Sequence, residues 1–243
     1  MANWSDPRMT AVPRAATGAR DAAFDAGLRS YMLSVYNYMA SGVLLTGIVA
    51  MLFVNTTFGL SLLANPAARL ILMLAPLGVV LAMSFGVNRF SEGTIKTLFW
   101  SYAVLMGVSL SSILLVYTGS SVAQAFFAAA VGFGSLSLYG YTTKRDLAPF
   151  GAFMMMAVFG LIAAMLINMF VKSSGMELII SGVGVLLFAG LTAFDTQRIK
   201  SNYFAVRGTD FYGKSAVMGA LTLYLDFINM FLFLLRFMGN QRN

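Results

Sequence analysis

The chain contains no cysteine and no histidine among its 243 residues. The absence of cysteine excludes disulfides, thiolate metal sites and a cysteine nucleophile. The absence of histidine excludes a Ser-His-Asp triad, a histidine-ligated metal and a histidine pH switch. Any proton sensing by this protein must therefore depend on carboxyl groups.

Charge is also scarce, because only 10% of the residues are charged while 59% are hydrophobic. A soluble domain carries about 25% charged residues, which keep its apolar surface in solution. The formal net charge is +7. The basic residues lie in short connections between apolar runs and not in one patch, so we expect no nucleic-acid partner. The composition predicts an integral membrane protein whose first partner is the lipid bilayer.

Long apolar runs are what the sequence has in abundance. A helix needs about 20 apolar residues to cross the roughly 30 Å hydrocarbon core of a bilayer. Seven runs meet this requirement, at about 31–54, 70–88, 97–117, 122–141, 148–171, 178–197 and 215–237. Helices satisfy all their backbone polar groups internally, and the short alternating segments of a membrane barrel are absent. We therefore predict an all-α membrane protein with a seven-transmembrane-helix bundle.

The same reading divides the chain into one folded domain and two tails. Residues 31–238 form the transmembrane domain, residues 1–30 a mobile cytosolic tail, and residues 239–243 a short C-terminal tail. Within the first tail, residues 21–29 are a candidate short helix at the membrane interface. No long linker or second domain is expected.

The basic residues of the connections predict the orientation of the bundle. When the connections are assigned to alternate sides, twelve basic residues fall on one side and four on the other. The positive-inside rule then places the N-terminus in the cytosol and the C-terminus outside. Arg236 and Arg242 follow the seventh run, so a re-entrant seventh segment that returns to the cytosol is the alternative.

Two acidic residues stand out because they lie inside apolar runs. Of nine acidic residues, only Asp195 and Asp226 do so. A carboxylate at membrane depth costs several kcal/mol, so each is a candidate functional residue. For Asp226 the alternative is a buried polar anchor for helix packing. For Asp195, near the cytosolic end of the sixth run, the alternative is a solvated helix end.

Polar residues share the helical faces of these two acids. Ser215, Thr222 and Asn229 fall on the face of Asp226, and Thr192 lies one turn before Asp195. Such a stripe is expected to face the bundle interior, where it either lines a pore or packs against another helix.

The two aspartates would form a proton switch if they met, although counting along the runs does not settle whether they do. Two like charges about 4 Å apart repel by about 4 kcal/mol at an effective dielectric constant near 20. The pair would therefore share one proton and could act as a gate. Its oxygens could bind calcium only weakly and transiently, because a tight site needs six to eight. Arg89, at the cytosolic end of the second run, is the candidate charge partner for Asp195; otherwise it is an ordinary cytosolic-side marker.

At these residues the chain resembles the Bax inhibitor-1 family, including its bacterial YccA-type members. The resemblance rests on Leu223-Tyr224-Leu225-Asp226-Phe227-Ile228-Asn229 with Leu234-Leu235-Arg236-Phe237, and on Phe194-Asp195-Thr196-Gln197-Arg198-Ile199. It covers about residues 30 to 238. It implies a seven-helix fold with a central helix, a pair of aspartates on the cytosolic side, here Asp195 and Asp226, and a pH-sensitive calcium leak. For YccA-like members it also implies interaction with a membrane AAA protease.

We therefore expect a calcium-permeable leak channel of a bacterial inner membrane, gated by the aspartate pair, with no resident cofactor and no enzymatic activity. The first alternative is a non-conducting regulator that binds a membrane AAA protease or another partner. The second is an intramembrane aspartyl protease. The sequence argues against the protease, because Leu223-Tyr224-Leu225 precedes Asp226 where such enzymes carry Gly-x-Gly.

Overall fold

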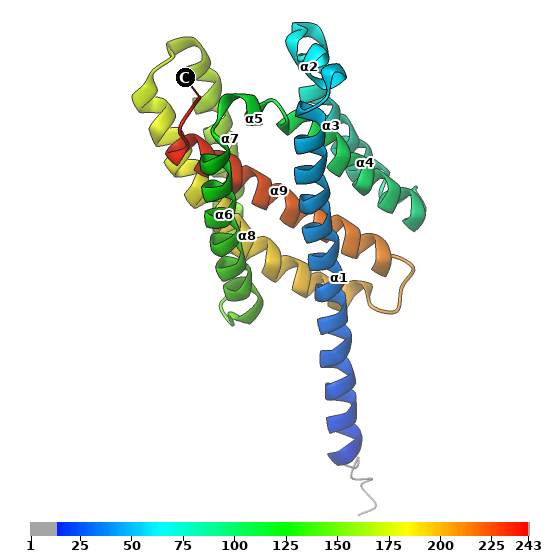
Figure 1. Cartoon of the computed structure of the whole chain (residues 1–243). Helices are drawn as coiled ribbons and strands as arrows, with labels where there is room; N and C mark the ends of the chain where they lie inside the picture. The colour runs from blue at the N-terminus through cyan, green and yellow to red at the C-terminus, as the bar shows by residue number, and fades with distance from the viewer. Residues whose placement is uncertain (1–13, 243) are drawn as a thin grey trace, which may run out of the picture.

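The computed structural model describes residues 14–242 and is all-α within them. Figure 1 shows the helices in chain order. Their bounds are α1 Arg14–Val54, α2 Thr57–Ala64, α3 Pro66–Gly86, α4 Glu92–Leu110, α5 Ile113–Val116, α6 Gly119–Thr142, α7 Ala148–Val171, α8 Ser174–Val206 and α9 Tyr212–Met238.

Seven helical segments are long and apolar enough to cross a membrane, which confirms the predicted number. The structure adds two short helices that hydropathy did not predict, α2 and α5. The third span is interrupted before α5, where Ser111 and Ser112 donate their hydroxyls to the carbonyls of Val108 and Ser109. Such local bonds compete with the helical ladder and favour a break at this point.

The first helix begins earlier than the sequence predicted. Residues 14–30, expected in the N-terminal tail, belong to α1. The membrane-spanning part of α1 starts at Ala26. The remainder of the predicted tail, residues 1–13, lies outside the described residues.

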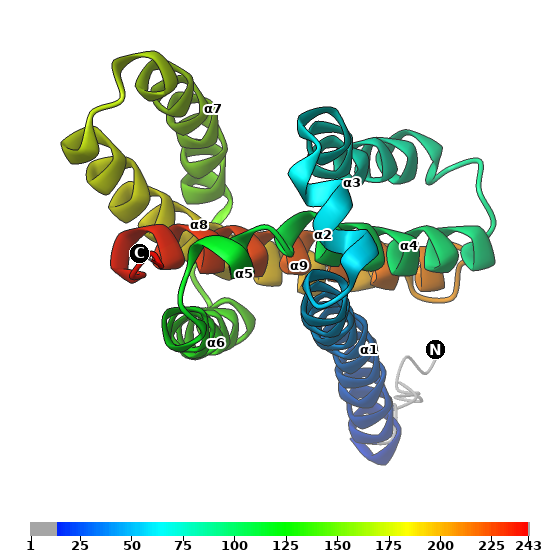
Figure 2. The ribbon, with the colours of Figure 1, turned by 45° about the horizontal axis from the view of Figure 1, so that its top comes forward.

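Helix α9 is the centre of the bundle. In its most apolar window 67% of the residues are buried, whereas the corresponding figure for α3 and for α7 is 11%. It packs against α1, α4, α6 and α8, most extensively against α8. Figure 2 shows α9 running across the middle of the molecule, with α1 and α6 on one side of it and α3 on the other. A side chain on α9 can therefore affect several helices at once.

The end of α9 lies beside the connection between α5 and α6. Thr118 N–H donates to the carbonyl of Asn240, and Arg242 N–H donates to the carbonyl of Val116. Tyr117 and Gln241 form an isolated antiparallel bridge. Because α9 is one uninterrupted helix, its end and the α8–α9 connection lie at opposite ends of the bundle.

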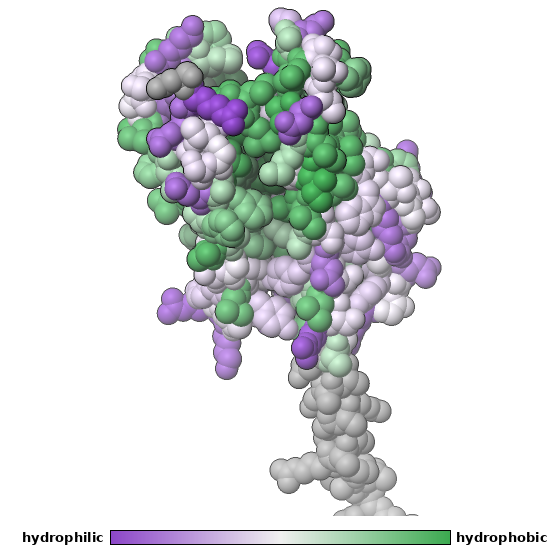
Figure 3. Space-filling model, viewed as in Figure 1, coloured by the Kyte–Doolittle hydropathy of each residue, from purple (hydrophilic) through white to green (hydrophobic). Residues whose placement is uncertain are grey.

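The outer surface is that of an integral membrane protein. Large apolar side chains are widely exposed, including Leu44, Phe85, Phe159 and Leu186. Figure 3 shows hydrophobic residues gathered over the middle and upper part of one face, with hydrophilic residues toward both ends. An exposed apolar surface of this extent is compatible with lipid and not with water.

Candidate functional site

The two aspartates lie at the same level of the α8–α9 pair. Helix α8 continues to Val206, so Asp195 lies about three turns before its end and not at a solvated terminus. Asp226 lies about four turns after the start of α9. Because the two helices are antiparallel and joined by a short connection, these distances bring the acids together. The prediction that the sixth span ends near residue 197 was wrong, and that error had left their contact undecided.

The carboxyl groups of Asp195 and Asp226 lie within hydrogen-bonding reach of each other and are shielded from water. The residues are 7% and 4% exposed, respectively. Asp226 Oδ2 is buried, and no donor reaches it from the described part of the chain. Two carboxylates can only accept hydrogen bonds, so a bond between them requires a proton on one of them. Two buried carboxyls this close are able to share one proton.

Arg198 is the basic residue closest to Asp195 along α8. Arg198 is exposed and lies one turn along the same helix. Arg89 is exposed in the turn after α3, and α3 packs mainly against α4. Val87, two residues before Arg89, accepts a hydrogen bond from Lys214 Nζ near the start of α9. Arg89 therefore lies near the α8–α9 connection, about three turns along these helices from the aspartates.

Three members of the predicted polar stripe bond to their own helices. Thr192 Oγ1 donates to the carbonyl of Phe188 at 2.7 Å, and Thr222 Oγ1 donates to that of Met218 at 3.1 Å. Asn229 Nδ2 donates to the carbonyl of Leu225 at 2.9 Å. These side chains flank the aspartates but satisfy their polar groups locally, which is how polar residues are tolerated inside a bundle.

The fourth member, Ser215, belongs to a separate polar cluster nearer the α8–α9 connection. Asn202 Nδ2 donates to Ser215 Oγ at 2.8 Å, and the hydroxyls of Ser215 and Tyr31 are hydrogen-bonded at 2.8 Å. This cluster ties α1, α8 and α9 together.

Apolar layers enclose the aspartate pair along the α8–α9 interface. Toward the connection, Ile199 packs against Gly219, where an added Cβ would lie 3.2 Å from Ile199 Cγ2. Toward the other end, the rings of Phe188 and Phe233 are stacked with their centroids 5.8 Å apart. Neither aspartate lines any of the main cavities found in the described part of the chain. The interface is closed on both sides of the pair.

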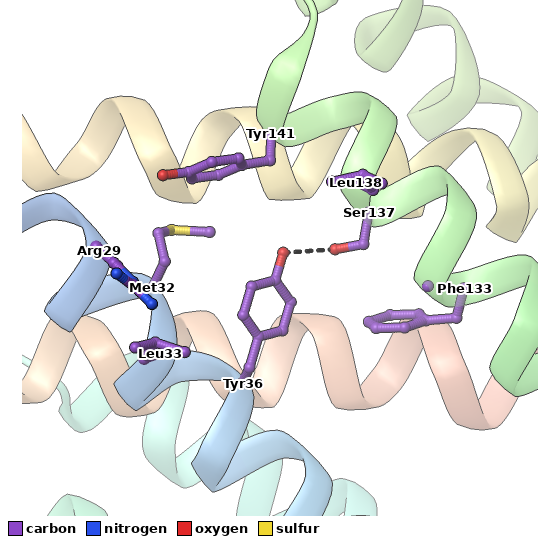
Figure 4. A pocket seen from close by; sticks show the side chains of 9 residues that line it. Arg29, Met32, Leu33, Tyr36, Phe133, Ser137, Leu138 and Tyr141 are labelled. Atoms are coloured by element: carbon purple, nitrogen blue, oxygen red, sulfur yellow. Dashed lines mark hydrogen bonds between the residues drawn. The ribbon is translucent and has the colours of Figure 1, made fainter. Parts of the chain in front are cut away.

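Tyr36 and Thr196, which were not singled out from the sequence, belong to a hydrogen-bonded chain next to the site. Thr196 Oγ1 and Ser137 Oγ are bonded at 2.9 Å, and Ser137 Oγ and Tyr36 Oη at 2.6 Å. The chain ends at a cavity of about 520 Å³ between α1 and α6, which Arg29 also lines (Figure 4). The only sequence signal was a hydroxyl residue directly after Asp195 in an apolar run.

Comparison with known proteins places this arrangement in a family. The family described as "Inhibitor of apoptosis-promoting Bax1" (Bax1-I) matches residues 28–243. Uncharacterized protein RP147 of Rickettsia prowazekii is 47% identical over 228 residues, which cover 93% of this chain and 96% of that protein. Inner membrane protein YbhL of Escherichia coli K12 is 44% identical over 220 residues, which cover 89% of this chain and 94% of that protein. The chain is thus an integral membrane protein that belongs to the Bax inhibitor-1 family.

Proposed function

We propose that this protein is a pH-sensitive, calcium-permeable leak channel in which Asp195 and Asp226 form the proton switch. The observation that carries the proposal is the contact between these two buried carboxyls, one of them on the central helix. The family resemblance points to the same activity. A bacterial inner membrane is the proposed location, because a 44% identical relative is named as an inner membrane protein. The proposed orientation has the N-terminus in the cytosol and the C-terminus outside.

The switch works through the force between α8 and α9. With one proton shared, the carboxyls attract each other and the layers around them stay closed. When that proton leaves, two charges about 4 Å apart repel by about 4 kcal/mol. The repulsion acts on α8 and α9 at a point between two apolar contacts, Ile199 with Gly219 and Phe188 with Phe233. Separation of the two helices would therefore loosen both contacts. The calcium leak should therefore rise with pH.

The ionised pair also provides the ion's binding position. Two carboxylates supply fewer oxygens than the six to eight of a tight calcium site. Weak binding suits a conducting pathway, because a permeant ion must leave as well as enter. Positive charge on the side of the α8–α9 connection comes from Arg198, one turn from Asp195, and from Arg89, near the start of α9.

The experiment is calcium flux into proteoliposomes that contain the purified chain, measured from mildly acidic to mildly alkaline pH. Wild-type flux should rise with pH. Asp195→Asn and Asp226→Asn each supply a hydrogen-bonding amide without the second charge, so their flux should stay low and flat. At the alkaline end, the calcium flux of each variant should be at least about tenfold below that of the wild type. A loss of only about 1.4 kcal/mol of the repulsion that opens the pathway would change the open population about tenfold. Glu177→Gln removes an exposed acid from the same helix and is the matched control.

Two results would contradict the proposal. Unchanged pH dependence in both variants would remove the aspartate pair from gating. If the pure wild-type protein conducts no calcium at any pH, the leak channel is excluded. Co-purification of a membrane AAA protease from native membranes would then favour the non-conducting regulator.

A further inference from the structure

A second cavity lies at the opposite end of the bundle from the α8–α9 connection. It has a volume of about 550 Å³ and is bounded by α2, the start of α3, the end of α4, α5 and the end of α9. Its walls are mostly apolar, with Arg69 and Arg236 among the lining residues. Because α3 begins and α9 ends here, the cavity lies at one membrane face whichever way the bundle is oriented.

The charge of this cavity is entirely positive. No acidic residue is among those that line it, and the described ion pair, Lys96 with Glu92, lies elsewhere. Arg69 comes from the first turn of α3 and Arg236 from the last turn of α9, and both side chains are exposed. The guanidinium of Arg236 lies 5.7 Å from the ring centre of Phe233, which supports it from one side. Two guanidinium groups from distant parts of the chain thus converge on this cavity. On its other side Arg236 borders a cavity that Glu177 lines, but within residues 14–242 no ion pair joins the two side chains.

The depth of the two arginines matches that of lipid phosphates. Both lie within one turn of the end of a spanning helix, where the hydrocarbon core gives way to headgroups. Deeper in the bundle, the wall continues with Met73, Met106 and Leu232, about one to two turns from the ends of α3, α4 and α9, and Met73 is itself exposed on the outer surface. The cavity therefore joins a positively charged mouth to an apolar, lipid-facing wall.

We infer that this cavity binds an anionic phospholipid. The guanidinium groups of Arg69 and Arg236 would hold the phosphate by charge-assisted hydrogen bonds, for which their planar fork is suited. The acyl chains would lie along Met73, Met106 and Leu232. Basic pockets between transmembrane helices commonly recognise anionic headgroups in this way. The inference is independent of the channel function, because it uses neither aspartate.

Such a lipid would connect a peripheral helix to the central one. Helix α3 is among the least buried of the spanning helices, and its packing partners are α2 and α4. A phosphate held by Arg69 and Arg236 would link α3 to α9 directly. Bound lipid should therefore stabilise the folded protein by mass action.

The test is native mass spectrometry of the full chain in neutral detergent, titrated with phosphatidylglycerol or with phosphatidylcholine of the same acyl chains. Wild type should bind phosphatidylglycerol at least about tenfold more tightly, because both lipids carry a phosphate but the choline cation of phosphatidylcholine cancels its charge beside the two guanidinium groups. Arg69→Gln and Arg236→Gln should each lose about tenfold in that affinity. Arg236→Lys keeps the charge without the fork and should lie between wild type and Arg236→Gln.

The control is Lys172→Asn, which removes a basic residue of the same face that does not line this cavity. Lys172 has φ 52°, a conformation that asparagine tolerates. Binding that does not distinguish the two lipids, or that falls equally in Lys172→Asn, would overturn the inference. Stabilisation of wild type by inorganic phosphate alone, to the same extent as by phosphatidylglycerol, would overturn it too, since the site would then take free anions. Equal melting temperatures of all variants without lipid would show that they fold alike.

Discussion

The contact between Asp195 and Asp226 reconciles two buried acids with a low-dielectric environment. An isolated carboxylate at membrane depth costs several kcal/mol, and two in contact would also repel each other. A shared proton removes one charge and turns the repulsion into a hydrogen bond. The flat, low flux expected of Asp195→Asn and Asp226→Asn follows from the same reasoning, because an amide provides the bond in either protonation state.

The sequence identified these two residues but not their geometry. An acid within an apolar run is conspicuous, so both candidates could be selected without a structure. Their contact could not, because Arg198, Lys200 and Asn202 lower the hydropathy of α8 well before the helix ends at Val206. Hydropathy locates the part of a helix that lies in hydrocarbon, whereas the helix itself continues as long as its backbone bonds do. Arg89 could be proposed as the charge partner but not placed relative to Asp195, because sequence gives no information on which helices are neighbours.

At the level of helices, close packing on both flanks holds α8 in place beside α9. Gly140 of α6 lies directly against Ala193, and Gly151 of α7 against the ring of Phe194. Both contacts fall next to Asp195. The number of spans and the central part of each were predictable from apolar run length. Helices α2 and α5 were not, since short interfacial helices depend on local caps such as Thr56, which accepts a bond from Gly59 N–H.

The glycines of α6 provide a matched test of this packing. A Cβ at Gly140 would lie 2.1 Å from the carbonyl oxygen of Ala193, whereas at Gly134 it would meet nothing within 4 Å. Gly140→Ala must push α6 and α8 apart and should destabilise the protein by about 1–3 kcal/mol. Gly134→Ala should be neutral or stabilising by about 0.5–1 kcal/mol, because alanine favours the helix. Thermal unfolding in detergent would measure both, and equal melting temperatures would argue against tight α6–α8 packing.

On the scale of the whole molecule, the bundle is organised around one buried helix. Helix α9 carries Asp226 in its middle and Arg236 in its last turn, so the proposed switch and the proposed lipid site are attached to the same element. Their distance along that helix allows each to be tested by variants that leave the other intact. The prediction of a single seven-helix bundle needed only composition and run length, because a membrane permits few other folds.

The orientation of the bundle can be tested with single cysteines, since the natural chain has none. Lys144, between α6 and α7, is predicted to face the cytosol, and Gln241, after α9, to face outward; both side chains are exposed. A membrane-impermeant maleimide on spheroplasts should label Gln241→Cys at once and Lys144→Cys only after lysis. Labelling of both from one side would instead indicate that α9 does not cross the membrane.

The central claim is that Asp195 and Asp226 share a proton, and infrared spectroscopy of the purified protein tests it most directly. At neutral pH the wild type should show the carbonyl stretch of a protonated carboxylic acid, although an exposed aspartate is fully ionised there. Asp226→Asn should abolish that band, because the amide replaces the proton as the donor to Asp195. A wild-type spectrum without the band, or one whose band survives in both single variants, would contradict the shared proton.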